Sequence, residues 1–79
     1  MWSEGSIGNL KSGKGICHYW VKHFEEPSQF GINGGRISKL MIKKDGVITC
    51  NYDRGWDIEP KAEDEMTNLA LCILLNNYN

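Results

Sequence analysis

Two alternating segments joined by a tight turn constrain this chain more than any other feature. Residues 36–43 and 47–54 mix β-branched, apolar and polar residues, and Lys44-Asp45-Gly46 lies between them. An Asp-Gly pair between two such segments is a strong signal for a β-hairpin. The sequence therefore predicts two antiparallel strands at the centre of the fold.

The loop length sets which side chains of this hairpin share a face. A two-residue loop would pair Lys44 with Val47 and scatter the apolar residues over both faces. A three-residue loop, with Gly46 in the left-handed region, pairs Lys43 with Val47 instead. It gathers three cross-strand pairs on one face: Ile42 with Ile48, Leu40 with Cys50, and Ser38 with Tyr52. Because burial selects one register, we expect the three-residue loop.

The rest of the chain predicts two more strands and a terminal helix. Residues 16–24 are dense in β-branched and aromatic residues and form the clearest further strand, whereas residues 2–7 form a weaker one. Residues 8–15 are rich in turn formers. They resemble a phosphate-binding P-loop, but Gly15 replaces the Ser or Thr that holds magnesium, so we interpret them as a plain connection. Residues 25–35 are a surface loop.

A helix is expected over residues 60–76. Pro60 suits the first helical position, acidic residues follow in the early turns, and apolar residues recur every three or four positions before the final asparagines end the helix. The chain is too short for more than one domain. We predict a single α+β domain over residues 1–79: a four-stranded antiparallel meander with the C-terminal helix on one face.

The predicted helix is more apolar than one sheet can cover. Residues 69–75 are apolar around the whole helix, so Leu71 or Leu75 should face outward. Either the loop 25–35 or the N-terminal segment covers this surface, or a second copy or another protein does. The candidate contact residues are Trp20, Leu71, Leu75 and Tyr78.

Trp20 lies in a segment with two unlike faces. Cys17, Tyr19 and Val21 form the better buried set, which leaves Trp20 among cations and aromatic residues on the other face. Such a stripe stacks a base or anchors a protein. Alternatively, the helix covers the Trp20 face; periodicity does not separate these two readings.

Chemical motifs give little support for catalysis. Neighbouring residues of a strand point to opposite faces, so Cys17 and His18 cannot form a catalytic pair, and no spacing indicates a metal or cofactor site. Residues 31–35 could form an anion-binding nest, with Arg36, Lys39 and Arg54 as the nearby cations. The net charge of −1 argues against nucleic acid as the partner.

The three cysteines show no Cys-x-x-Cys pair, and no segment has the length or composition of a signal peptide or a membrane span. We therefore expect reduced thiols and a cytoplasmic protein without membrane contact.

Two segments resemble a known family: Gly-Gly-Arg-Ile-Ser-Lys-Leu at residues 34–40 and Asn-Tyr-Asp-Arg-Gly-Trp-Asp at residues 51–57. They are similar to a small domain family of unknown function found in gut Firmicutes, their phages and mobile elements, and the resemblance spans about residues 2–57. It implies a stand-alone accessory protein and brings no catalytic residues. Small phage proteins are often counter-defence factors, including anti-CRISPR inhibitors and sponges for nucleotide signals.

Together these observations predict a non-enzymatic binding protein that inhibits a host factor by protein contact. The alternatives are a homodimer that binds a small anionic ligand, such as a nucleotide signal, and a purely structural homodimer.

Overall fold

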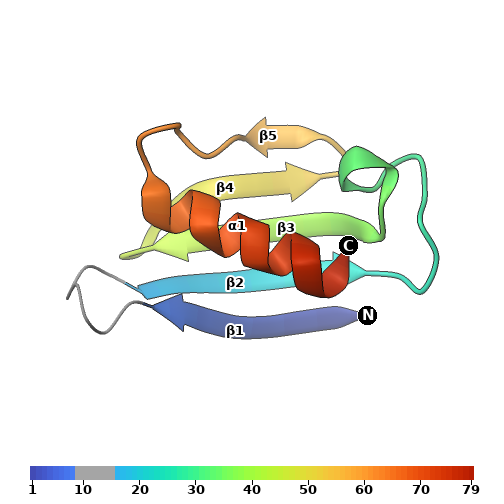
Figure 1. Ribbon diagram of the computed structural model, residues 1–79, viewed down its shortest axis with the longest axis horizontal. Helices are drawn as coiled ribbons and strands as arrows, with labels where there is room; N and C mark the ends of the chain where they lie inside the picture. The colour runs from blue at the N-terminus through green and yellow to red at the C-terminus, as the bar shows by residue number, and fades with distance from the viewer. Residues whose placement is uncertain (9–15) are drawn as a thin grey trace.

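The computed structural model describes residues 1–8 and 16–79, so the predicted turn-rich connection over 9–15 lies outside the described residues. The fold is α+β: one antiparallel sheet in the order β1-β2-β3-β4-β5, with a single helix across one face (Figure 1). The elements are β1 (Trp2–Gly8), β2 (Ile16–His23), a short 3-10 turn (Ile32–Gly34), β3 (Ile37–Lys44), β4 (Val47–Asp53), β5 (Trp56–Ile58) and α1 (Glu65–Tyr78).

The prediction of four strands was wrong by one, because a short fifth strand follows the hairpin. Arg54 takes a φ of 55°, and the Asp53 amide donates to the Gly55 carbonyl at 2.9 Å, which reverses the chain within two residues. Trp56 then pairs with Tyr52, and the two rings meet edge to face at 5.1 Å. Three residues are too few to show an alternating pattern, so no local pattern indicated β5.

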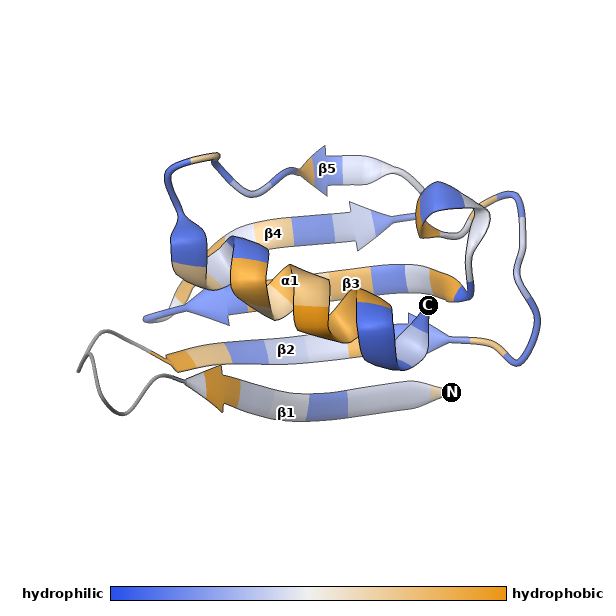
Figure 2. Cartoon of the chain, in the orientation of Figure 1, coloured by the Kyte–Doolittle hydropathy of each residue, from blue (hydrophilic) through white to orange (hydrophobic). Residues whose placement is uncertain are grey.

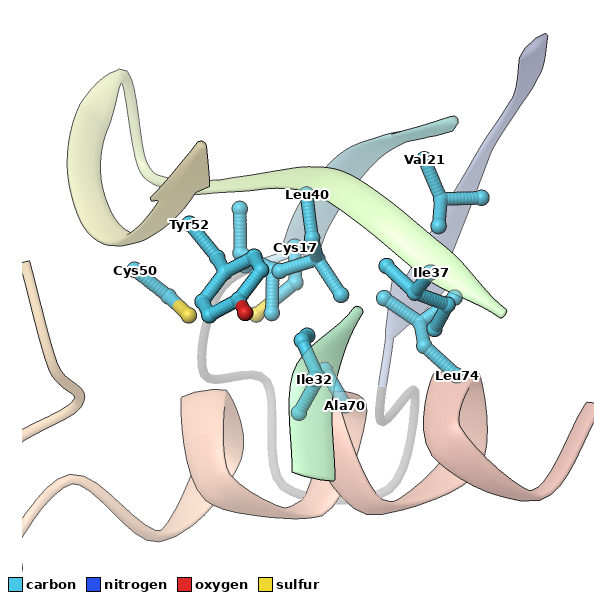
Figure 3. Close-up of a cluster of buried hydrophobic side chains, with 10 residues drawn as sticks. Cys17, Val21, Ile32, Ile37, Leu40, Cys50, Tyr52, Ala70 and Leu74 are labelled. Atoms are coloured by element: carbon cyan, nitrogen blue, oxygen red, sulfur yellow. The ribbon is translucent and has the colours of Figure 1, made fainter. Parts of the chain in front are cut away.

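The hydrophobic core lies between α1 and one face of the sheet. Figure 3 shows side chains from β2, β3 and β4 pointing towards the helix, and Figure 2 shows hydrophobic residues concentrated in the middle turns of α1. The buried apolar residues are Cys17, Val21, Ile32, Ile37, Leu40, Ile42, Cys50, Tyr52, Ala70 and Leu74. The helix therefore covers the Cys17 and Val21 face of β2, which resolves the alternatives left open for Trp20.

The predicted register of the hairpin was wrong, although the predicted inner face was largely right. Asp45 and Gly46 have φ values of 53° and 82°, as a two-residue type I′ turn requires, and Lys44 pairs with Val47. A β-bulge then shifts the register, so that Ile42 lies opposite Cys50 and Leu40 opposite Tyr52. The extra residue in β4 restores the apolar face that the two-residue turn would otherwise have scattered.

The helix begins five residues later than the predicted start at Pro60. Asp64 is its N-cap, because its side chain accepts a hydrogen bond from the Thr67 amide at 3.1 Å. The same carboxylate accepts from the Thr67 hydroxyl at 2.7 Å and from Lys44 Nζ at 2.8 Å. Thr67 is fully buried and its hydroxyl lies 2.8 Å from that of Thr49, the bulge residue of β4. This cap junction, defined by Lys44, Thr49, Asp64 and Thr67, ties the helix start to β3 and β4.

The other end of the helix is also fixed, whereas the sequence predicted that residues 76–79 would end it loosely. The helix runs to Tyr78, and the Asn79 side chain bonds the loop that precedes β3. Its Oδ1 accepts from the Ile37 amide at 3.0 Å, and its Nδ2 donates to the Ile32 carbonyl at 3.0 Å. A Cβ at Gly35 would collide with this amide, so glycine is required there for the close approach.

Substituting Asp64 with Asn should destabilise the protein by about 1–2 kcal/mol at neutral pH, since it weakens the cap and leaves Lys44 without its counter-charge. Burial alone would raise the pKa of Asp64, but the hydrogen bonds from Lys44 and Thr67 outweigh burial and lower that pKa. The stabilisation is therefore complete above the unfolded-state pKa of about 3.9 and is lost as the pH falls through the lower folded-state value. Urea unfolding of both proteins at pH 7 and pH 3 should show a smaller difference at pH 3. The exposed Glu63→Gln control should change neither the stability at pH 7 nor its dependence on pH. An equal loss of stability at both pH values in Asp64→Asn would contradict the stabilising role of the ionised carboxylate.

Substituting Asn79 with Ala should cost about 1–3 kcal/mol, because it removes two partly buried hydrogen bonds to backbone groups. Thermal unfolding monitored by circular dichroism measures the loss. Asn77, which is exposed two residues earlier, provides the matched control, and its replacement by Ala should change stability by less than about 0.5 kcal/mol. Equal effects of the two substitutions would show that the bonds from Asn79 contribute nothing.

Candidate functional site

The face of the sheet opposite α1 carries a second, distinct set of side chains. The pairing registers place Trp20 opposite Glu4 and Met41, and Lys22 opposite Trp2 and Lys39. Because side chains alternate along a strand, this open face is made by every second residue of β1 to β4. Its members are Trp2, Glu4, Ser6, His18, Trp20, Lys22, Lys39, Met41, Lys43, Asn51 and Asp53.

A hollow of about 540 Å³ lies on this open face. Its lining combines apolar surface with polar and charged ends of side chains: Trp2, Trp20, Lys39, Leu40, Met41, Lys43, Asn51, Tyr52 and Asp53. A volume of this size falls within the range of small-ligand sites. We call it the Trp20 hollow.

Lysine ammonium groups lie close to the aromatic rings of the open face. Lys43 Nζ is 5.9 Å from the centre of the Trp20 ring. Lys22 Nζ is 6.0 Å from the Trp2 ring and 5.5 Å from the Phe24 ring. At these distances a cation is attracted by the electrons of the ring face. Apolar ring surface and positive charge are thus combined in the same positions.

Asp53 supplies negative charge at one side of the Trp20 hollow. Its Oδ1 lies 3.8 Å from Lys39 Nζ and 3.9 Å from Arg54 Nε, and all three side chains are well exposed. Such pairs contribute little to stability. Within the described ranges, neither Lys22 nor Lys43 makes an ion pair, so their charge is available to a ligand.

Of the three cations predicted to hold an anion, Lys39 and Arg54 both lie beside the Asp53 carboxylate, whereas Arg36 is separate from them. Lys39 lines the Trp20 hollow, whereas Arg54 lies on the turn after β4 and contacts Asp53. Arg36 lines another hollow, of about 320 Å³, at the end of β2. The glycine-rich segment before Arg36 instead forms the 3-10 turn whose Ile32 enters the core.

The predicted protein-contact residues are also divided between the two faces. Trp20 lies on the open face, as one of the two readings expected, but Leu71 and Leu75 are half-buried and pack against the core. Tyr78 stacks on His23 with ring centres 4.7 Å apart. The expectation that Leu71 or Leu75 faces outward was wrong because Thr67, Ala70 and Leu74 point at the sheet and place both leucines on the flanks. Leu69, with 58% of its surface exposed, and Cys72 face solvent instead.

Sequence reasoning missed the combination of residues at the Trp20 hollow rather than its members. Alternation within 16–24 placed Trp20 and Lys22 on one face, and alternation in the hairpin placed Lys39, Met41 and Lys43 on one face. What joins them is the β2–β3 register, in which Trp20 faces Met41. No local signal in the sequence sets that register, because a loop of more than ten residues connects the two strands.

The fold is that of a small α+β protein in which one sheet face is covered and the other is open. The sequence model of a family described as a domain of unknown function (DUF7678) matches residues 1–79. The chain belongs to this family. Comparison with curated proteins gave no match, and comparison with solved structures gave none either.

Two further observations concern chemistry and membranes. No group of three or more His, Cys, Asp or Glu side chains suited to a metal ion occurs in residues 1–8 and 16–79. In the same part of the chain, no helix combines the length and the apolar character that crossing a membrane requires.

Thiol reactivity should separate the three cysteines. Burial raises the pKa of Cys50 to about 12 and also raises that of Cys17, so neither forms the reactive thiolate at neutral pH. Cys72 is exposed on α1. We expect Ellman's reagent to modify one thiol in the native protein and all three in denaturant. Native Cys72→Ser should then react hardly at all; rapid modification of two or more thiols in the native wild type would contradict the buried positions.

Proposed function

We propose that this protein is a non-enzymatic binding protein that works through the open face of its sheet and takes a nucleotide unit in the Trp20 hollow. The observation that supports this most is the composition of that hollow, in which an indole ring and Met41 lie between Lys39 and Lys43. A ring face stacks on a nucleobase, and a lysine ammonium binds a phosphate. These are the two chemical halves of a nucleotide.

The positions of these groups suit such a ligand. Lys43 lies 5.9 Å from the Trp20 ring centre, so a base stacked on the ring has a cation within reach of its phosphate. Asn51 and Asp53 line the same hollow and offer hydrogen-bonding groups to the edge of a base. Stacking of this kind contributes about 1–3 kcal/mol per base.

The net charge of −1 led us to expect no nucleic-acid partner, and the local distribution of charge changes that expectation. Many of the acidic residues lie between β5 and the first turn of α1: Asp57, Glu59, Glu63, Asp64 and Glu65. The open face instead presents Lys22, Lys39 and Lys43 against Glu4 and Asp53. Because salt screens charges more than about 10 Å apart, a phosphate responds to the nearby lysines rather than to the total charge.

Inhibition of a host protein by direct contact is the second candidate function. The resemblance to proteins of phages and mobile elements favours it, and a counter-defence role accommodates both candidates, since a nucleotide-binding protein can act as a sponge for a nucleotide signal. Trp20 and Met41 belong to residue types enriched in protein interfaces, and Leu69 adds exposed apolar surface on the helix. Lysine, however, is depleted in the centres of protein interfaces, so three lysines around Trp20 favour the nucleotide.

Titration with adenosine 5′-monophosphate, followed by NMR shifts of backbone amides, tests the proposed function. We expect saturable shifts confined to β1, β2, β3 and β4, whose residues line the hollow, with a dissociation constant in about the millimolar range or tighter. Trp20→Ala should weaken binding by about tenfold or more, as loss of one stacked ring predicts. Phe30, an aromatic residue exposed on the loop before β3, gives the matched control, and Phe30→Ala should bind as the wild type does. Shifts unaffected by Trp20→Ala, or no shifts at all, would reject the nucleotide site.

A further inference from the structure

We infer that the ligand of the open face is a single-stranded nucleic acid rather than a free nucleotide, an inference that rests on the proposed function. The Trp20 hollow is not isolated. A second hollow, of about 320 Å³, lies at the end of β2 and is lined by Met1, His23, Phe24, Glu25 and Arg36. It repeats the combination of an aromatic ring with a cation, here Phe24 with Arg36.

Lys22 connects the two hollows. Its ammonium group lies 6.0 Å from the ring of Trp2, which lines the first hollow, and 5.5 Å from the ring of Phe24, which lines the second. The order along β2 and the residue that follows it is therefore ring, cation, ring, at Trp20, Lys22 and Phe24, with further cations at Lys39 and Lys43 on the neighbouring strand. A strand of nucleic acid has the matching order, because each phosphate lies between two bases.

The distance between the rings of Trp20 and Phe24 distinguishes a strand of nucleic acid from a single nucleotide as the ligand. Trp20 and Phe24 are four residues apart, across the register shift at Lys22 and His23, which corresponds to up to about 13 Å. One nucleobase cannot stack on both rings over that distance, whereas successive bases of one strand can. Phe24 is 46% exposed and Trp2 is 58% exposed, so both rings are open to such contact.

The same geometry favours a single strand over a duplex. In a duplex the bases stack on each other and present only their edges in the grooves, so exposed rings on a sheet gain no stacking contact. A single strand has unstacked base faces, and lysines beside the rings bind its backbone without regard to sequence. We therefore expect binding with little sequence preference.

Fluorescence anisotropy with labelled oligothymidylates of two, four and eight nucleotides, with thymidine monophosphate as competitor, tests the inference. The eight-nucleotide strand should bind at least about tenfold more tightly than the monophosphate, since a second stacked ring and further phosphate contacts are added. With three or four phosphates neutralised by Lys22, Lys39, Lys43 and Arg36, log K against log salt should have a slope of about −2 to −3. Lys22→Ala should reduce the magnitude of this slope by about 0.7, because one phosphate contact is lost.

Matched variants distinguish binding of a whole strand from binding of one nucleotide in the Trp20 hollow. Phe24→Ala should remove most of the gain with length while monophosphate binding persists, whereas Trp20→Ala should weaken both. Phe30→Ala should change neither.

If the eight-nucleotide strand binds no better than the monophosphate, the inference of a single-stranded ligand is overturned and the proposed nucleotide site stands. If neither binds, both proposals are overturned. A hairpin duplex that binds as tightly as the single strand would overturn the stacking geometry.

Discussion

The carboxylate of Asp64 is the contact on which the arrangement of this small fold depends. It caps α1 through Thr67 and pairs with Lys44 at the end of β3, so one group both starts the helix and fixes it to the sheet. Thr67 continues the junction to Thr49, the extra residue of the β4 bulge. At the opposite end, the Asn79 amide bonds Ile37 at the start of β3 and Ile32 in the turn before it. With both ends fixed, the helix lies across one face only.

Among residues 1–8 and 16–79, one helix covers one face of the five-stranded sheet and the other face is open, and the side chains there show how the protein tolerates this. Apolar rings alone would form an exposed patch that promotes aggregation. Here Lys22 and Lys43 lie close to the rings of Trp2, Phe24 and Trp20, which keeps ring surface and charge in the same positions. In the proposed function, the same pairing also supplies the contacts for a ligand that is both aromatic and anionic.

The side chains of the open face are held mainly by the four longer strands of the sheet. β1 and β5 are the outer strands of the meander, and β5 has only three residues. The densest pairing joins β1, β2, β3 and β4, and the rings and lysines of the open face belong to these strands or, for Phe24, follow β2 directly. A rigid sheet holds such side chains more accurately than a loop does, so little ordering of the protein is needed on binding.

Local pattern in the sequence determined four of the five strands, the helix, the composition of each strand face and the α+β class, because alternation and helical periodicity report which side chains can be buried together. It grouped Cys17 with Val21 on one face of the strand over 16–24, without deciding which face is buried, and it grouped Lys39, Met41 and Lys43 on one side of the hairpin. Loop chemistry was less well determined: Asp45-Gly46 forms a two-residue turn, and a bulge at Thr49 compensates for it. Only the tertiary structure decided that Asp64 rather than Pro60 marks the helix start, that Asn79 closes onto the sheet, and that Trp20 lies beside Met41. These depend on contacts between segments far apart in the chain, and no local pattern encodes the register in which such segments meet.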